Sequence, residues 1–440
     1  MKVKQILPVT VLAIAALTGC EGKKEMNSGI KISNMDTTAV RGADFYQYAC
    51  GGWMAANPLT DEYSRFGTFD QLAENNREQL KGLISDIAAG QHEQGSIAQK
   101  IGDLYNLAMD AEKLNADGMT PIQPDLDKIN AINDKNGIIE AMAELTGSAY
   151  FAFYVGADIM DSKNNIFQLY QGGIGLGEKE YYLEDDEATK NIREGYKAHI
   201  VKMFQLIGQD EKQATKSMEA VMEIETRLAK KAFNAVEQRN PAANYHMLTL
   251  DELKKEIPGL DWDAYLNAVG VKGVSSLNVS QIEPVKEAVA IINELPLDKQ
   301  KAYLQWKLID SAAGYLSDAF VAQNFEFYGK VMSGKKEDQP RWKKAVGTVN
   351  GVLGEAVGQM YVEKYFPAAA KERMVQLVKN LQVALGERIQ NLEWMGEETK
   401  AKAIEKLNTF YVKVGYPDKW KDYSSLNIEK DSYWANIKRA

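Results

Sequence analysis

The stretch DFYQYACGGWMAANPLTDEYSRFGTFDQL, residues 44–72, is the most distinctive part of this sequence and decides its interpretation. Seven aromatic residues, a cysteine, a Gly-Gly-Trp run and a single arginine lie within it. Cys50 could be a nucleophile, but no basic partner lies near it in the sequence, and its aromatic surroundings favour a buried thiol. We therefore expect this dense segment to open a packed domain and expect any catalytic residues to lie elsewhere in the chain.

The length and charge of the chain limit the classes of protein to which it can belong. A chain of 440 residues is too long for one simple core, so we expect two lobes or more. Apolar residues make up 45% and charged residues 26%, which is typical of soluble globular proteins. The net charge is −9 and no run is rich in lysine and arginine, so nucleic-acid binding is disfavoured.

The first twenty residues have the pattern of an export signal. Lys2 and Lys4 precede an apolar run over 6–17 that is too short to span a bilayer as a helix. The run ends in Leu17-Thr18-Gly19-Cys20, which resembles the lipobox of bacterial lipoproteins, where the cysteine becomes the lipidated N-terminus. The alternative is an ordinary secretory signal that happens to end near a cysteine.

The lipobox predicts where the mature protein begins and where it is held. We expect a signal peptide over 1–19, lipidation of Cys20 and a flexible tether over the mostly polar residues 20–43. The protein would then be a membrane-anchored lipoprotein of the bacterial cell envelope, on its periplasmic or surface side. With Cys20 acylated, Cys50 is either a buried thiol or bonded to a cysteine outside these 440 residues.

Apolar spacing predicts a mainly α-helical chain with one small β-hairpin. The aromatic and β-branched runs 149–159 and 164–176, separated by a turn-like Met160-Asp161-Ser162-Lys163, predict the hairpin. Val412 to Gly415 could start a further strand, and the last residues, SYWANIKRA, show no closing element. Helices are expected over 69–87, 97–109, 188–207, 211–236, 250–256, 262–268, 285–294 and 298–320, and two long helices over 342–390, broken at Phe366-Pro367.

The histidines do not have the spacing of a catalytic zinc site. Such a site of the metalloprotease type needs two histidines one helical turn apart with a glutamate beside the first. The chain has His92, His199 and His246, and none has another histidine within four residues. HEQGS at His92 has Ser96 in the second histidine position, so His92 is better explained as a loop residue. We expect no metal site and no catalytic residue in this chain.

Other motifs with a known chemistry also fail. No Glu-x-x-His, calcium-loop or Gly-x-Ser-x-Gly pattern occurs. GGIGLG, residues 172–177, has Glu178 where the dinucleotide-binding pattern needs its last glycine, and it follows a predicted hairpin strand. Structural glycines in a tight connection explain it better.

Several segments in the same order resemble the M13 metallopeptidases, the family of neprilysin, endothelin-converting enzyme and bacterial oligopeptidases. The opening stretch reads Asp-Phe-Tyr, Tyr-Ala-Cys-Gly-Gly-Trp, Asn-Pro and Ser-Arg-Phe-Gly-Thr-Phe, which is similar to that family's N-terminal motif. Further similar segments lie at 154–183, 233–253, 339–367 and 391–420. The resemblance covers residues 41–440.

The resemblance implies a fold and, for a complete enzyme, an activity. Residues 44–440 would form the family's N-terminal helical domain, with two subdomains and an incomplete C-terminal side. The complete enzyme would be a zinc-dependent endopeptidase that cleaves short peptides. The family's H-E-x-x-H helix, its third zinc ligand and its Asn-Ala strand lie beyond the region matched here, so the chain is expected to be inactive alone, as a split gene, a frameshift or an incomplete sequence would make it.

The resemblance also assigns expected roles to two residues of the opening stretch. The cysteine equivalent to Cys50 bonds in the family to one near the C-terminus, so its partner would lie in the missing region. The arginine equivalent to Arg65 contacts substrate and can pair with a peptide's C-terminal carboxylate, for which a planar guanidinium is suited. We expect Phe66 and Phe69 to pack into the lobe while Arg65 stays solvated; the alternative for Arg65 is a structural ion pair. A second arginine of some relatives is Ala73 here.

Two functions of different classes follow. The first is the N-terminal, substrate-enclosing part of a zinc metalloendopeptidase, whose partners are short peptides, a catalytic C-terminal region in cis or in trans, and a membrane reached through the lipid. The second is a non-catalytic, lipid-anchored helical protein that binds peptides or proteins. A downstream reading frame encoding H-E-x-x-H would favour the first.

Overall fold

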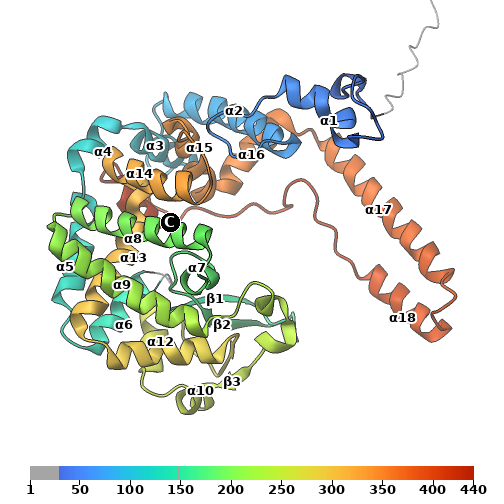
Figure 1. The fold of residues 1–440 in the computed structure, drawn as a ribbon. Coiled ribbons are helices and arrows are strands. Elements are labelled where there is room, and N and C mark those ends of the chain that lie inside the picture. The colour runs from blue at the N-terminus through green and yellow to red at the C-terminus, as the bar shows by residue number, and fades with distance from the viewer. Residues whose placement is uncertain (1–28, 146–148) are drawn as a thin grey trace, which may run out of the picture. The chain divides into compact units, whose positions relative to one another are not determined.

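A computed structural model describes residues 29–145 and 149–440, so the predicted signal peptide and Cys20 lie outside the described residues. The chain divides into two compact units, one ending at Thr60 and one from Asp61 to Ala440 (Figure 1). The opening stretch of the sequence is therefore shared between the units. No helix in the described ranges is long and apolar enough to cross a membrane.

The Gly-Gly pair of the opening stretch lets two segments of the first unit approach closely. The unit contains the 3₁₀ helix η1 (Ile32–Asn34) and helix α1 (Phe45–Ala56), which begins where Asp44 Oδ1 accepts the Gln47 N–H at 2.8 Å. A Cβ atom on Gly52 would lie 2.4 Å from the Ser33 carbonyl oxygen. The contact between η1 and α1 therefore depends on this glycine.

The second unit contains two clusters of buried apolar side chains. One joins α2 (Thr68–Ala88) and α3 (Ile97–Met109) to α15 (Arg341–Val352) and α16 (Gly354–Tyr365). The other and larger cluster lies among α5 (Gln123–Ala131), α6 (Lys135–Glu144), α8 (Glu187–Leu206), α9 (Glu211–Lys231), α12 (Ile282–Glu294), α13 (Leu297–Ala312) and the sheet. Both are assembled from segments far apart in the sequence.

Short helices connect these elements. They are α4 (Ala111–Asp117), η2 (Thr120–Ile122), α7 (Glu180–Leu183), η3 (Glu237–Arg239), η4 (Pro241–Asn244), α10 (Leu250–Glu256), α11 (Trp262–Ala268), η5 (Ala313–Tyr315), α14 (Asp318–Asn324) and the π-helix η6 (Phe325–Val331). The helix expected over 298–320 is interrupted at η5, and the one expected over 342–366 is divided at Leu353.

The predicted hairpin is confirmed, but it belongs to a larger sheet. Strands β1 (Phe151–Ala157) and β2 (Asn165–Gln171) pair antiparallel, and the described sheet has the order β1-β2-β4-β3. Strand β4 (Ser276–Val279) lies parallel to β2 and antiparallel to β3 (Met247–Thr249). Strands β3 and β4 were not expected, because they are too short for an alternating pattern to be recognised. The strand suggested at Val412 is wrong, since that segment is irregular.

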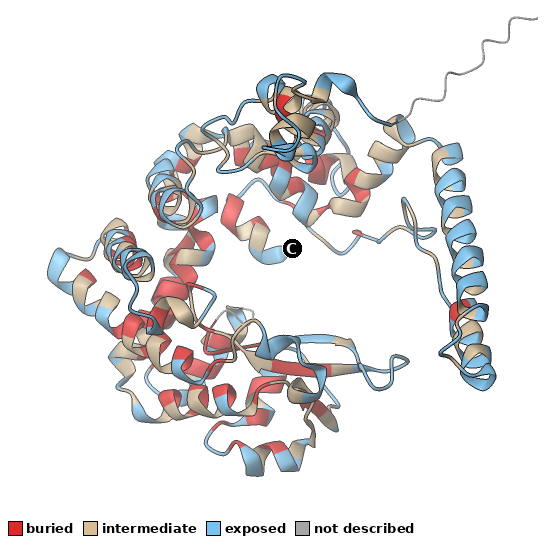
Figure 2. Cartoon of the chain, turned by 45° about the vertical axis from the view of Figure 1, so that its right-hand side comes forward, coloured by how far each residue is buried: buried red, intermediate tan, exposed pale blue. Residues whose placement is uncertain are grey.

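The helical pair α17 (Ala368–Gln390) and α18 (Glu397–Asn408) differs from every other long helix described. None of the residues of α17 is buried, although its sequence has a clear apolar stripe (Figure 2). The two helices contact each other near Gly386, where a Cβ atom would lie in ordinary contact with Leu407, 3.6 Å away. The irregular segment after α18 returns to α3, where Lys100 Nζ donates to the Tyr423 carbonyl oxygen at 2.7 Å.

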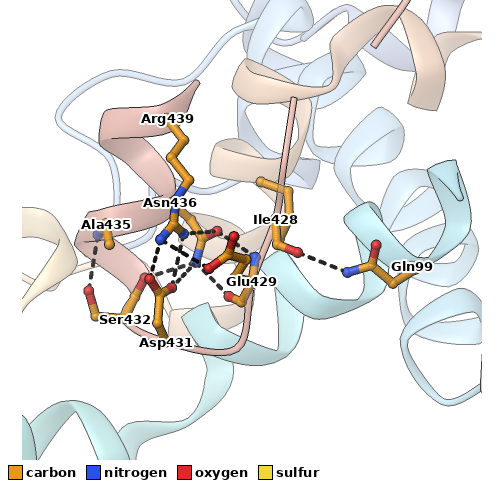
Figure 3. Close-up of polar contacts among 8 residues, drawn as sticks. All are labelled: Gln99, Ile428, Glu429, Asp431, Ser432, Ala435, Asn436 and Arg439. Atoms are coloured by element: carbon orange, nitrogen blue, oxygen red, sulfur yellow. Dashed lines mark hydrogen bonds and ion pairs between the residues drawn. The ribbon is translucent and has the colours of Figure 1, made fainter. Parts of the chain in front are cut away.

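The final residues do form a packed element, which corrects the expectation for SYWANIKRA. Helix α19 (Tyr433–Arg439) begins where Ser432 caps the Ala435 N–H, and Asn436 bonds the main chain of Glu429 in both directions (Figure 3). Trp434 and Lys438 both reach Asp125 on α5, with Lys438 Nζ 2.7 Å from a carboxylate oxygen.

A buried polar network holds the GGIGLG connection in the larger cluster. Glu225 on α9 is fully buried and accepts hydrogen bonds from the hydroxyls of Tyr182 at 2.6 Å and Tyr196 at 3.0 Å. Burial raises the pKa of Glu225, although Lys307 and the hydrogen bonds from the two tyrosines act in the other direction. A Cβ on Gly175 would collide with the Tyr196 hydroxyl at 1.9 Å. The glycines are thus structural, as the sequence indicated.

We expect the Tyr196→Phe substitution to destabilise the protein by about 1–3 kcal/mol, because it removes a donor to Glu225 and leaves the buried Trp306 Nε1–H without its acceptor. Tyr265→Phe is the matched control: Tyr265 is equally buried, and its hydroxyl has no hydrogen bond in the part of the chain described. Urea unfolding of both variants measures the difference. Equal losses would show that the network contributes no more than packing.

Candidate functional site

The candidate site is the segment from Asp61 to Phe69, which leads into α2 and contains Arg65. At its beginning, the Asp61 carbonyl oxygen accepts the N–H groups of Lys336 and Glu337, both at 3.0 Å. At its end, the Gly67 N–H donates to Asp70 Oδ2 at 2.8 Å, and α2 starts at the next residue. The segment is therefore fixed at one end to the connection before α15 and at the other to the start of α2, both in the same unit.

A cluster of charges fixes the middle of the segment. Lys343 on α15 has a side chain only 9% exposed, and its Nζ lies 2.6 Å from Glu62 and 2.7 Å from Glu74. The Tyr63 hydroxyl donates to Glu74, and Arg77 donates to the same hydroxyl at 3.2 Å. One ammonium group thus joins the segment before α2, α2 itself and α15.

Electrostatics support this cluster. Burial alone would raise the pKa of Glu74, but hydrogen bonds from Lys343, Tyr63 and Arg77 outweigh it and lower that pKa below its usual value. Burial and the neighbouring Glu74 raise the pKa of Tyr63. At neutral pH the carboxylate is therefore charged and the phenol protonated, which is the state that the hydrogen bonds require.

Arg65 lies between these two anchors and is exposed. Its guanidinium forms no hydrogen bond or ion pair with any residue that the structure describes. Arg77 nearby, in contrast, donates to the Tyr63 hydroxyl and pairs with Glu74. The backbone on either side is held and the side chain is left available. That arrangement suits a group that binds an anion supplied from outside the unit.

The packing expected for the two flanking phenylalanines is only half correct. Phe66 is half-buried and meets the Tyr63 ring edge-on, with 5.0 Å between the centroids. Phe69 is 89% exposed, so it does not pack into the lobe. Phe69 lies in the first turn of α2. By helical spacing it shares a face with Leu80 and Ile84, but that face is buried only further along the helix.

The three histidines lie in separate parts of the chain, His92 after α2, His199 on α8 and His246 before β3, and do not form a site. His92 Nε2 lies 2.7 Å from the Ile87 carbonyl oxygen, and His246 Nδ1 lies 2.9 Å from that of Val279. His199 on α8 is stacked on Phe327, and burial lowers its pKa to about 4. Within residues 29–145 and 149–440, no three His, Cys, Asp or Glu side chains are grouped so as to hold a metal ion. The described residues therefore do not fit a catalytic zinc ion.

Cys50 lies on α1 in the first unit, half-buried, and forms no disulfide within the described ranges. Its pairing with a cysteine outside these 440 residues stays a prediction. The role of Arg65 in binding substrate also stays a prediction. Ala73, which stands where some relatives have a second arginine, is exposed on α2.

Sequence reasoning missed the support around Arg65. Lys343 lies 281 residues from Glu62, and no local pattern indicates that the two meet. The helical spacing of Glu74 and Arg77 was visible, but such pairs are common on exposed helix faces and carry no information on function.

We expect Lys343→Met to destabilise the protein by about 1–3 kcal/mol, because it leaves Glu62 and Glu74 with no cation between them. Lys336→Met is the matched control, since Lys336 is 79% exposed and pairs with Asp61 at 3.2 Å; it should cost less than about 0.5 kcal/mol. Thermal unfolding at low and high salt compares the two. An equal effect of both variants would mean that Lys343 is no more than a surface ion pair.

Comparisons with known proteins show which family the chain belongs to. The sequence profile described as "Peptidase family M13" matches residues 42–417. Endothelin-converting enzyme 1 of Rattus norvegicus is 29% identical over 418 residues, which are 92% of this chain and 54% of that protein. This chain thus spans about half the length of the curated relatives it matches.

Solved structures give the same result. A zinc metalloprotease of Mycobacterium tuberculosis, Zmp1 in complex with an inhibitor, superimposes with a TM-score of 0.87 at 32% identity, covering 94% of this chain and 63% of that one. PepO from Lactobacillus rhamnosis superimposes with a TM-score of 0.75 at 21% identity, covering 93% of this chain and 64% of that one, which shows a shared fold. With the family profile matching most of its length, this chain belongs to peptidase family M13.

Proposed function

We propose that this chain is the N-terminal, substrate-enclosing part of a zinc-dependent metalloendopeptidase that acts on short peptides in the cell envelope. The observation that carries the proposal is the family match over 42–417 in a chain that spans only 54% to 63% of its relatives. The described residues do not fit a zinc ion, so the metal ligands and the groups that move protons would come from other sequence. What these residues contribute is binding and enclosure.

In this function Arg65 binds the C-terminal carboxylate of a peptide. Two observations support the role: the side chain is exposed and without a partner in the described residues, and the segment around it is held by Lys343 and by the cap at Gly67. A guanidinium can give a carboxylate two parallel hydrogen bonds, and a held backbone reduces the entropy lost on binding.

In the enzyme reconstituted with a catalytic C-terminal region, we expect Arg65→Ala to raise KM for peptides with a free C-terminal carboxylate. The loss in kcat/KM should correspond to about 1–3 kcal/mol, as for a charge-assisted hydrogen bond, and amidated peptides should be affected less. Arg65→Lys keeps the charge without the planar fork and should fall between the two. An equal loss for free and amidated peptides would make Arg65 structural.

The apolar stripe of α17 is the surface on which the catalytic region would dock. Met374, Leu377, Leu381 and Leu385 recur at helical spacing and are 42%, 48%, 60% and 45% exposed. A stripe of this kind is normally covered, and α18 covers only part of the helix near Gly386. This chain covers 63% of Zmp1, so about 37% of that chain has no counterpart here and would supply the missing partner.

We expect Leu381→Glu to weaken complementation by a separately expressed catalytic region at least tenfold, since it would place a charge in an apolar interface. Gln376→Glu is the matched control: it adds the same charge to the same helix on the opposite face and should leave complementation unchanged. Peptidase activity titrated with the second chain measures both. Equal activity of the two variants would exclude this face as the interface.

Two results would instead favour the second function, a non-catalytic lipid-anchored protein that binds peptides or proteins. One is that the chain gives no activity with a catalytic region encoded downstream. The other is that no downstream sequence encodes H-E-x-x-H. Both functions share the predicted anchor at Cys20, because the lipobox is independent of the rest of the chain.

We expect Cys20→Ala to abolish incorporation of labelled fatty acid and to leave the signal over 1–19 uncleaved, because the thiol is the acylated group in a lipoprotein. Cys50→Ala retains Cys20 and should be labelled as the unaltered protein is. Metabolic labelling followed by electrophoresis shows both effects, and lipid on the Cys20→Ala variant would place the anchor elsewhere or exclude it.

A further inference from the structure

Strand β1 leaves one edge of the sheet open. In the described sheet β1 is the outermost strand and pairs only with β2. The Asp158 N–H donates to the Asn164 carbonyl oxygen at 2.9 Å, which fixes the residues of even number as those whose main chain faces β2. The N–H and C=O groups of Phe153, Val155 and Ala157 therefore point to the open edge.

The far side of β2 confirms this assignment. The Leu169 carbonyl oxygen accepts the Ser280 N–H at 2.7 Å, and the Gln171 N–H donates to Gln281. Residues of odd number on β2 thus face away from β1, as an antiparallel register with Phe153 opposite Leu169 requires.

In strand β1 as described, three features that proteins use to prevent strand addition are missing: a charged residue, a proline and a β-bulge. The seven residues FAFYVGA carry no charge and no proline, and the register with β2 runs without a bulge. Tyr154 and Val155 are 52% and 56% exposed. The opposite edge, β3, is only three residues long and leads directly into α10. The sheet is therefore protected at one edge and open at the other.

The hairpin is also held in place. Asp158, at the end of β1, accepts hydrogen bonds from the Tyr245 hydroxyl at 2.9 Å and from the Met160 N–H at 2.9 Å. Tyr154 meets Tyr170 edge-on across the pair, with 5.7 Å between the centroids. A partner strand would find the donors and acceptors already aligned, which lowers the entropic cost of binding.

We propose that the β1 edge binds an extended peptide by strand addition along Phe153 to Ala157. This inference rests on the proposed function for the identity of the occupant, a peptide substrate. Main-chain hydrogen bonds read a peptide without regard to its sequence, which suits an enzyme that accepts many peptides. Exposed Val155 and Tyr154 on opposite faces favour uncharged, β-branched or aromatic neighbours in the bound segment.

A second copy of the chain is the less suitable occupant. The open length is about five residues, whereas a stable interface between two proteins takes about 20–30 residues from each side. A short peptide needs no more than the edge itself supplies.

The test is a titration of the full chain with a fluorescein-labelled peptide, Lys-Thr-Val-Thr-Val-Thr-Lys, followed by fluorescence anisotropy. Val155→Pro and Ala157→Pro each remove one N–H that faces the edge without removing a bond to β2, and each should weaken binding by about three- to tenfold. Val155→Thr keeps the N–H and the branched side chain, so its affinity should be within about twofold of the unaltered chain. The same peptide with every amide N-methylated should not bind. Circular dichroism confirms that each variant is folded.

Three results would overturn the proposal: equal affinity of Val155→Pro and Val155→Thr, binding of the N-methylated peptide, or a concentration-dependent dimer that Val155→Pro dissociates, which would make a second copy the occupant. Because the titration needs no catalysis, its failure leaves the complementation experiment untouched. Loss of complementation with peptide binding intact would in turn reject only the proposed function.

Discussion

The return of the chain after α18 depends on a buried ammonium group. Lys100 on α3 is 2% exposed, and its Nζ donates to the Tyr423 carbonyl oxygen at 2.7 Å, while the adjacent Gln99 bonds that of Ile428. A buried cation is costly unless its donors are satisfied; main-chain oxygens at fixed positions do this here, and the charge of Asp422 lies nearby. These bonds hold the chain around Tyr423 and Ile428 against α3, and the chain then leads into α19, which reaches Asp125 on α5. Tyr423 and Ile428 are also buried members of the smaller cluster.

Much of the fold could be predicted because its helices carry their own signals. The spacing in 97–109 and the cap residue Ser96 set the bounds of α3 as observed. The breaks at Leu353 and Ala313 were not predicted. Glycines lie beside both, at 351, 354 and 314, but an isolated glycine is tolerated within a helix and does not by itself show where the helix ends. Strand β4 pairs with β2, and β3 pairs with β4, so these two short strands depend on partners far away in the sequence.

The candidate site divides in the same way. Arg65 was found from a local motif, and the cap at Gly67 follows from neighbouring residues. Its support by Lys343 is non-local and could not be derived from one sequence, because any of the many lysines could have been the partner. The wrong expectation for Phe69 has a simple cause: an aromatic residue was assumed to be buried, but the first turn of a helix often turns a side chain toward solvent.

The exposure of α17 has a consequence for the local unfolding of the protein. A helix of 23 residues with no buried side chain draws little on tertiary packing, so its order comes largely from intrinsic propensity, and its composition of Ala, Leu, Gln, Glu, Lys and Arg provides it. Its amides should exchange with solvent through local fraying at a small fraction of the free energy that protects α8 or α9. The helical pair is then the least cooperative part of the fold, able to unwind and re-form while both clusters of the second unit stay intact.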